Sequence, residues 1–189
     1  MFEYRIDEDV SLRMFTERDA KEFYLLTMAS RNHLKKWLGW LNQIRTIEDT
    51  VRHINGALQT FVSLGGFPTT FAIIYRGKIA GTISFNKISE LHHTGSIGYW
   101  IGENYSGKGI VSKAFSQMLT YGFQTLHLNR IEVRVAEGNT KSRAIPERFG
   151  FVEEGKLRQV EWLYDHYVDH IVYGLLKEEW QARNQTKQE

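Results

Sequence analysis

The sequence contains no cysteine, and this absence removes several kinds of chemistry. A thiol nucleophile, a thiolate acid and a cysteine-ligated zinc site all require cysteine, and without it the fold is indifferent to the redox compartment. Long apolar runs are also missing, since no stretch approaches the roughly 18 residues of a membrane span. The N-terminal segment MFEYRIDEDV carries acidic residues where a secretory signal has a basic end and an apolar stretch. We therefore expect a cytoplasmic protein with no membrane partner.

A strong charge of either sign is missing too. The chain has 24 Lys and Arg against 22 Asp and Glu, which gives a net charge of +2. Nucleic-acid-binding proteins normally carry a concentrated basic face, so we expect no direct contact with nucleic acid. Local charge is more informative: Lys108 lies between two glycines, Gly107 and Gly109, Lys113 follows this glycine turn, and Lys141 and Arg143 come further along. These cations could gather at one anionic ligand, although an ordinary solvated face explains any one of them.

Internal repeats, linkers and low-complexity tracts are absent from the 189 residues. A domain of this length buries about 70% of the surface that its unfolded chain exposes, so it needs no disulfide or metal for stability. We predict one domain over residues 1–182 and a disordered tail over residues 183–189. The sequence leaves open whether the chain forms a homo-oligomer.

The glycine pair lies in the segment ENYSGKGIVSKAFSQMLTYGF, which starts at Glu103. Gly107 and Gly109 have no Cβ, so the backbone can bend sharply and bring successive amide groups against a phosphate. The following residues have apolar side chains at helical spacing from Ile110 to Leu126, which predicts an amphipathic helix. Such a helix adds its partially positive N-terminus to the turn. A turn of this kind suits a phosphate group.

The segment before the glycines, GSIGYWIGE from Gly95, is short, apolar and rich in strand-forming residues. The order strand, glycine turn, helix is the context that a phosphate-binding turn needs. Two known motifs are nevertheless excluded. The spacing of a Walker loop is missing, and Ser112 stands where a dinucleotide fingerprint has its third glycine. A glycine pair that merely shapes a tight loop remains an alternative.

The rest of the chain predicts a mixed α/β fold. Thr16 with Asp19, and Thr46 with Asp49, are N-cap pairs that open two helices, the second running to about Leu64. A hairpin turns at Arg76 and Gly77. The expected strands are residues 10–14, the two arms of this hairpin, and residues 95–102, 130–136, 151–163 and 167–176. The segment EGNTKSRAIPERFG, which starts at Glu137, opens a further helix that Gly150 closes.

This order predicts a mostly antiparallel central sheet with splayed middle strands and helices on both faces. Ligands of open sheets bind where neighbouring strands diverge. Residues 34–41 form an aromatic helical patch, which we interpret as core packing rather than a ligand platform. His92 and His93 are adjacent in a turn without partnering carboxylates or cysteines, so we expect loop residues and no metal site.

These motifs carry a resemblance that covers almost the whole chain. GYWIGENYSGKGIVSKAF, RIEVRVAEGNTKSRAIPERFGFVEEG and QVEWLYDHYVDHIVYGLL resemble the GCN5-related N-acetyltransferases, and within them the Rim-type enzymes that acetylate N-termini of ribosomal proteins. The resemblance implies acetyl-CoA as cosubstrate, with its pyrophosphate on the glycine turn and its pantetheine arm beside the strand at Tyr99–Gly102. It further implies that Asn139 hydrogen-bonds that arm. The implied binding residues are Trp100, Ile101, Gly102, Tyr105, Ser106, Gly107, Lys108, Gly109, Ile110, Val111, Asn139 and Arg143.

The resemblance also implies two catalytic residues: Glu161 as the base acting on the amine, through water, and Ser142 as the acid protonating the departing thiolate. Two positions differ from the family pattern. Asn104 replaces the usual Gln or Arg three residues before the first glycine, and Pro146 cannot donate to the carbonyl of Ser142 and should bend its helix.

The implied chemistry is reasonable on its own terms. An α-amine has a pKa near 7.7 to 8.0, so a base must remove a proton before or during attack. The oxyanion formed on the thioester could be stabilised by a backbone N–H of the Trp100–Ile101 stretch. A leaving thiolate with a pKa near 8.5 needs only modest help, so Ser142 should matter less than Glu161.

Other interpretations of the same residues stay open. Glu161 could be a solvated strand residue, Ser142 and Asn139 could be helix-capping residues, and His166 and His170 could be surface polar residues. At the level of function, the acceptor could instead be a small amine such as a polyamine, an amino sugar or an antibiotic. A non-catalytic CoA-binding sensor is a third possibility, against which the presence of both Glu161 and Ser142 argues.

Overall fold

The computed structural model describes residues 3–185, which group into two compact units. The first unit is formed by the chain up to Ser84 together with Tyr99–Gln117. The second is formed by Phe85–Gly98 and the chain from Met118 onward. Among the described residues, eight strands form one sheet in the order β1-β2-β3-β4-β5-β6-β8-β7. The β5–β6 pairing is parallel, whereas the β1–β2, β2–β3, β3–β4, β6–β8 and β7–β8 pairings are antiparallel.

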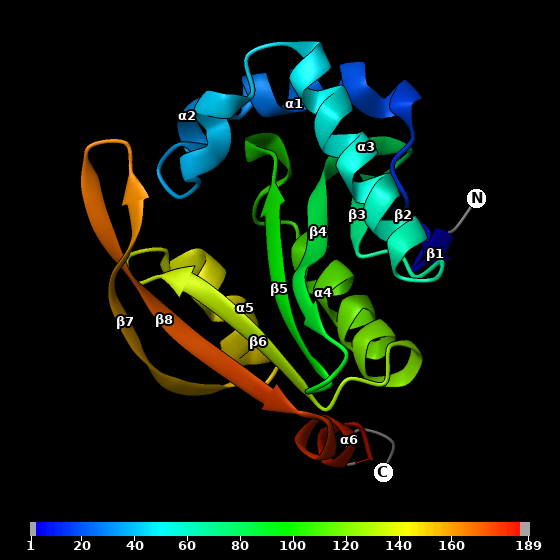
Figure 1. The fold of residues 1–189 in the computed structure, drawn as a ribbon, viewed down its shortest axis with the longest axis vertical. Coiled ribbons are helices and arrows are strands. Elements are labelled where there is room, and N and C mark those ends of the chain that lie inside the picture. The colour runs from blue at the N-terminus through cyan, green and yellow to red at the C-terminus, as the bar shows by residue number, and fades with distance from the viewer. Residues whose placement is uncertain (1–2, 186–189) are drawn as a thin grey trace. The chain divides into compact units, whose positions relative to one another are not determined.

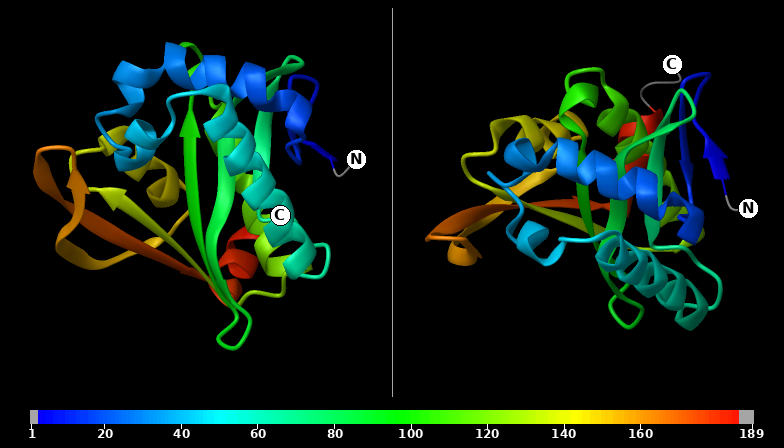
Figure 2. Two further views of the ribbon diagram at one scale, coloured as in Figure 1. Left: turned by 45° about the horizontal axis from the view of Figure 1, so that its top comes forward. Right: turned by 90° about the horizontal axis from the view of Figure 1, so that it is seen from above.

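The first unit begins with the strands β1 (Glu3–Arg5) and β2 (Val10–Arg13). Three helices follow: α1 (Ala20–Ala29), α2 (Arg31–Leu34) and α3 (Ile47–Ser63). The expected hairpin comes next as β3 (Thr70–Tyr75) and β4 (Lys78–Ser89). The last elements are β5 (Thr94–Ile101), of which only the end belongs to this unit, and α4 (Ile110–Thr120), which belongs to it as far as Gln117. The helices α1 and α3 lie side by side (Figure 2).

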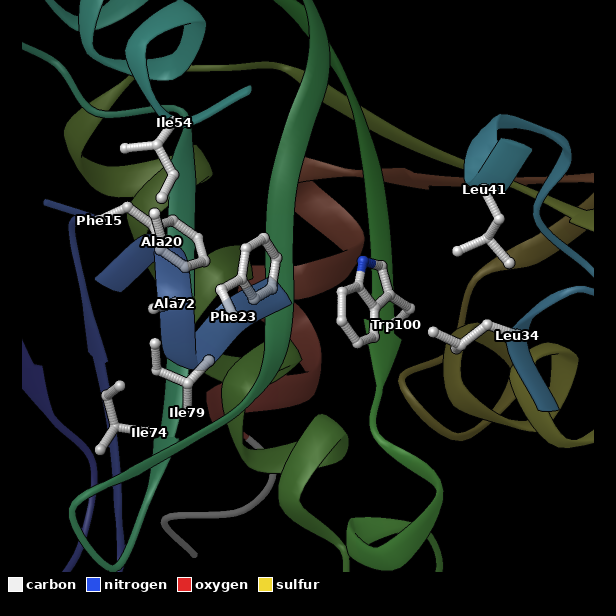
Figure 3. Packing of buried hydrophobic residues seen from close by; sticks show 10 residues of the cluster. All are labelled: Phe15, Ala20, Phe23, Leu34, Leu41, Ile54, Ala72, Ile74, Ile79 and Trp100. Carbon is white, nitrogen blue, oxygen red and sulfur yellow. The ribbon is translucent and has the colours of Figure 1, made fainter. Parts of the chain in front are cut away.

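The core of this unit lies between α1, α3 and the strands. Phe23 of α1 stacks on Trp100 of β5, with ring centroids 5.4 Å apart, and Leu34 and Leu41 are buried in the same cluster (Figure 3). Trp40 and Leu38 pack against it. The core-packing interpretation of the aromatic patch is therefore confirmed, although the patch is not one helix: α2 ends at Leu34 and a 3-10 turn covers Gly39–Gln43.

The second unit contains β6 (Arg130–Ala136), α5 (Thr140–Arg148), β7 (Val152–Leu163), β8 (His166–Leu176) and α6 (Lys177–Gln185). Figure 1 shows β7 and β8 as a long hairpin whose strand β8 runs beside β6. Ile131, Val133 and Val135 of β6 are buried, as their alternation predicts. The mixed α/β, mostly antiparallel fold expected from the sequence is confirmed.

One boundary expectation is wrong. The disordered tail expected at residues 183–189 does not begin at residue 183, because α6 continues to Gln185; residues 186–189 lie outside the described part. Two contacts explain this helix. The Glu179 carboxylate accepts a hydrogen bond from the Leu176 N–H at 2.8 Å, and Trp180 packs on Phe123 with ring centroids 5.2 Å apart. A side-chain cap and an aromatic contact outweigh the polar composition of the segment.

Asp19 gives the first unit a pH-dependent contribution to stability. This carboxylate is 8% exposed and accepts two hydrogen bonds of 2.7 Å from Arg13 and one of 2.7 Å from the Thr16 N–H. Burial alone would raise the pKa of Asp19, but the hydrogen bonds from Arg13 and Thr16 outweigh it and hold this pKa below its ordinary value. The stabilisation is therefore fully present above the unfolded pKa of about 3.9 and is lost as the pH falls through the folded value.

We expect Asp19→Asn to lower the free energy of unfolding by about 2 to 4 kcal/mol at neutral pH, because it leaves a half-buried guanidinium without its anion. Urea unfolding curves at several pH values measure this difference, which should shrink below about pH 4. The exposed pair of Arg76 and Asp9 provides a control, since Asp9→Asn should cost no more than about 1 kcal/mol. A constant difference at all pH values would contradict this account of Asp19.

Candidate functional site

The glycine turn links the end of β5 to α4 within the first unit. After Ile101 the chain passes through Gly102 and a 3-10 turn over Glu103–Tyr105, and Ser106 is extended. Gly107 and Gly109 then have φ angles of +78° and +73°. This left-handed conformation is unfavourable for side chains with a Cβ, and a Cβ at either position would meet no atom within 4 Å. The backbone conformation therefore favours glycine at both positions. The space beside both residues is open.

The turn presents backbone amides at the start of α4. The Gly109 carbonyl accepts the hydrogen bond from the Lys113 N–H at 3.1 Å, so Gly109 stands at the N-cap of the helix. The N–H groups of the first helical turn have no acceptor within their own helix, and the helix dipole adds positive potential there. An amide-lined turn of this kind fits the pyrophosphate of a CoA molecule, and Ile110 and Val111 are its first helical residues.

The cations of this turn have different surroundings. The Lys108 ammonium lies 5.8 Å from the ring centroids of both Tyr75 and Tyr105. Lys113 instead forms an ion pair of 2.6 Å with Asp7. The hydrogen bond between them lowers the pKa of Asp7 and raises the pKa of Lys113. Lys108 is therefore the better candidate for an anionic ligand, since the charge of Lys113 is already balanced.

The end of β5 is fixed by packing. The Trp100 side chain is 8% exposed and lies in the core, so any contact of Trp100 with a ligand must come from its backbone. Tyr99 packs edge-on against Phe115 of α4, with ring centroids 5.6 Å apart, and the Gly102 N–H donates to the Ala80 carbonyl at 2.8 Å. These contacts attach the strand, the turn and the helix to one another.

The second group of expected site residues surrounds the start of α5, in the other unit. The Asn139 side chain accepts a hydrogen bond from the Ser142 N–H at 3.3 Å, which makes Asn139 the N-cap. Pro146 is buried inside the helix, which is continuous over Thr140–Arg148. The capping interpretation of Asn139 is thus correct, and it leaves the amide nitrogen of this side chain as the donor for a ligand.

Arg143, which follows Ser142 in α5, takes part in a polar network that the sequence does not indicate. Its Nε–H donates to the Tyr173 hydroxyl at 2.8 Å, and this hydroxyl donates to the Glu147 carboxylate at 2.7 Å. Arg143 also contacts Glu153 at 3.3 Å. Burial raises the pKa of Tyr173, so the phenol stays protonated and can bridge the arginine and the carboxylate. The guanidinium therefore links the start of α5 to β8.

Glu161 lies on β7, where its Oε2 is 2.8 Å from the Nε2 of His170 on β8. The two side chains are 33% and 16% exposed. His166, by contrast, is the first residue of β8 and contacts Asp165 of the preceding turn at 2.6 Å, and its side chain is 62% exposed. The sequence indicates no role for His170 beyond that of a possible surface polar residue, because its contact with Glu161 depends on an irregular strand pairing that has no local sequence signal.

Across residues 3–185, no group of three or more His, Cys, Asp or Glu side chains could hold a metal ion. His92 and His93 lie in the turn between β4 and β5, as expected. In the same described range, no helix is both long and apolar enough to span a membrane.

The chain belongs to the acetyltransferase (GNAT) domain family, whose model matches residues 9–152. It is 34% identical over 184 residues to a putative ribosomal N-acetyltransferase of Bacillus subtilis, with 96% of this chain and 99% of the relative covered. It is 31% identical over 170 residues to the ribosomal-protein-serine acetyltransferase of Escherichia coli, with 90% and 94% covered.

Solved structures agree with this membership. A probable acetyltransferase has a TM-score of 0.88 and 32% identity, with 95% of this chain and 99% of that chain covered. The microcin C7 self-immunity acetyltransferase, solved with acetyl-CoA and AMP, has a TM-score of 0.83 and 29% identity, with 90% and 94% covered. The expected family, fold and cosubstrate are confirmed: the chain is an acetyl-CoA-dependent N-acetyltransferase.

Proposed function

We propose that this enzyme acetylates the α-amine at the N-terminus of a protein, with a ribosomal protein as the natural acceptor. The observation that carries this proposal is the match along more than nine-tenths of the chain, at 34% identity, to a relative named as a ribosomal N-acetyltransferase. A second relative, at 31% identity, is named for a serine acceptor on a ribosomal protein. Acetyl-CoA and ribosomal proteins meet in the cytoplasm, where we expect the reaction to occur.

In this proposal the residues of the first unit hold the cosubstrate. The open backbone of Gly107 and Gly109 and the start of α4 bind the pyrophosphate, and Lys108 adds a positive charge. The backbone at Trp100–Gly102 runs along the pantetheine arm. The role of Ser106, in the same turn, is to present its backbone to the phosphates. The geometry that supports this assignment is the pair of positive φ angles directly before an amphipathic helix.

The residues of the second unit act on the reacting groups. Glu161 accepts a proton from the acceptor ammonium, and Ser142 protonates the departing thiolate. Asn139 hydrogen-bonds the pantetheine arm through its amide nitrogen, and Arg143 holds the start of α5 against Tyr173. What supports Glu161 as the base is its fixed contact with His170, which restricts the carboxylate to one orientation.

For the acceptor, we expect peptides beginning with a small residue such as Ser or Ala to be acetylated best. The test is a panel of peptides that differ only in the first residue, each with a version whose α-amine is blocked, with release of free CoA as the measurement. Turnover should disappear when the α-amine is blocked. Equal turnover with the blocked peptides would contradict an N-terminal acceptor.

A small amine is the second candidate acceptor. The observation in its favour is the 29% identity to the microcin C7 self-immunity acetyltransferase. Polyamines, amino sugars and amine-bearing antibiotics belong in the same assay. Turnover of any of these compounds at a higher kcat/KM than the best peptide would replace the N-terminal proposal.

A further inference from the structure

We propose that His170 is a positioning residue for the acetyl transfer, holding the carboxylate of Glu161 in the orientation of a general base. The inference rests on the proposed function, in which Glu161 takes the proton from the amine. The observation that supports it is the distance of 2.8 Å between the Nε2 of His170 and the Oε2 of Glu161. The histidine is the more buried partner, with 16% of its side chain exposed against 33% for the glutamate.

The backbone of the β7–β8 hairpin creates this contact. Leu157 pairs with His170 and Glu161 pairs with Val168, so four residues on β7 correspond to two on β8. In a regular ladder Gln159 would face Val168, and the bulge puts Glu161 there instead. Residues directly opposite each other share a face of the sheet, so Glu161 becomes the diagonal neighbour of His170. Bulges re-aim side chains in this way, often beside active sites.

The bulge is held by a specific interaction. Gln159 has a φ of +50°, and its N–H donates to the Asp169 carboxylate at 2.8 Å. Asp169 also pairs with Lys156 at 3.4 Å, and Lys156 reaches the Glu137 carboxylate at 3.0 Å. Asp169 and Lys156 neighbour His170 and Leu157 in sequence, so they lie on the opposite face of the hairpin. On the remaining side of His170, its partner on β6 is the uncharged Ala136.

The contact determines which groups can move a proton. An ionised carboxylate can only accept hydrogen bonds, so the Nε2 of His170 must donate to the Oε2 of Glu161. The ring nitrogen of His170 that carries the hydrogen is therefore Nε2. Oε1 is then the oxygen that accepts the proton from the ammonium, while the N–H to Oε2 is kept. The ammonium loses one proton and Glu161 gains it, so His170 exchanges nothing. Its contribution is therefore to orient the carboxylate.

The experiment compares His170→Leu with His170→Gln in steady-state kinetics. Leucine removes the donor, and we expect kcat to fall by about 10- to 100-fold with the KM for acetyl-CoA unchanged. The Nε2 of glutamine can reach a similar position, so His170→Gln should recover a large part of the loss. The matched control is His166→Leu, which removes the other histidine–carboxylate contact of the same hairpin. This control should keep the kcat of the unaltered enzyme.

A double-substitution cycle separates positioning from a structural role. If His170 acts through Glu161, adding His170→Leu to Glu161→Gln should lower kcat by less than about twofold. A full additional loss in the double variant would overturn the proposal, and so would an unchanged kcat in His170→Leu. The cycle is measured with whichever amine the unaltered enzyme acetylates fastest. If the proposed acceptor is wrong, the measurements on the unaltered enzyme show it. The comparison of the variants still tests the role of His170, because it uses an amine that the enzyme does acetylate.

A second measurement requires no acceptor. In nitrogen-15 NMR of the imidazole rings, the contact predicts that His170 carries its proton on Nε2 in the unaltered protein. Glu161→Leu should change the His170 signal while leaving that of His166 in place. A His170 signal insensitive to this substitution would overturn the pairing, whatever the acceptor proves to be.

Discussion

Replacing Glu161 by Gln is expected to lower turnover by about 10² to 10⁴-fold, the usual contribution of a general base, while acetyl-CoA binding is retained. The glutamine side chain would keep the size of the glutamate but could not accept the proton. Because an α-amine has a pKa near 7.7 to 8.0, raising the pH makes more of it neutral and reduces the need for a base. The loss should therefore shrink above about pH 8. Steady-state kinetics across this range measure both effects.

Two comparisons make the result specific to Glu161. The first is Glu153→Gln, which changes another carboxylate of β7. Because Glu153 contacts Arg143 and not His170, the kcat of this variant should fall far less than that of Glu161→Gln. Calorimetric titration with acetyl-CoA should give the same affinity for Glu161→Gln and the unaltered enzyme. A Glu161→Gln variant that turns over at the unaltered rate near neutral pH would assign the base to another residue or to bulk water.

Replacing Gly109 by Val is expected to abolish most acetyl-CoA binding. The Cβ of the new residue would enter the open space in front of the turn, and its branched side chain would compete with the phosphates for the backbone amides. Each hydrogen bond to a charged group contributes about 1.5 to 3 kcal/mol, so losing even one lowers affinity by at least about tenfold. Thermal unfolding with and without acetyl-CoA measures this loss. At a hundredfold excess over Kd, the ligand should stabilise the unaltered enzyme by about 2.7 kcal/mol.

Strain at a left-handed residue needs its own control. Gly77, in the turn between β3 and β4, has a φ of +76° against +73° for Gly109, and its Cβ would also meet no atom within 4 Å. Gly77→Val should therefore destabilise the fold to a similar extent and leave acetyl-CoA binding intact. If Gly109→Val remains folded and binds normally, the pyrophosphate lies elsewhere.

Local sequence signals predicted most elements of the fold. The cap pairs Thr16 with Asp19 and Thr46 with Asp49 open helical segments in the structure as expected, because a capping box depends only on residues three apart. Gly150 follows α5 with a positive φ of 80°, as its position after the helical pattern suggests. Short-range chemistry was sufficient in these cases.

Contacts between distant residues could not be predicted in the same way. The β7 bulge that brings Glu161 to His170 depends on the carboxylate of Asp169, on the neighbouring strand. The network of Arg143, Tyr173 and Glu147 likewise joins α5 to β8. The helix α6 was not expected from the sequence, and its Trp180 packs on Phe123, far back in the chain. Each of these features requires knowledge of which strands and helices meet.

The central claim, acetyl transfer to an N-terminal α-amine, is tested most directly by locating the acetyl group on a product. The acceptor is a peptide that begins with Ser, carries a free α-amine and contains an internal lysine, and it is incubated with acetyl-CoA and the enzyme. Tandem mass spectrometry then assigns the modified nitrogen, and free CoA is measured in parallel. We predict one acetyl group on the α-nitrogen, with an equal amount of free CoA released. Acetylation of the lysine side chain instead, or release of CoA without any acetylated peptide, would contradict the account.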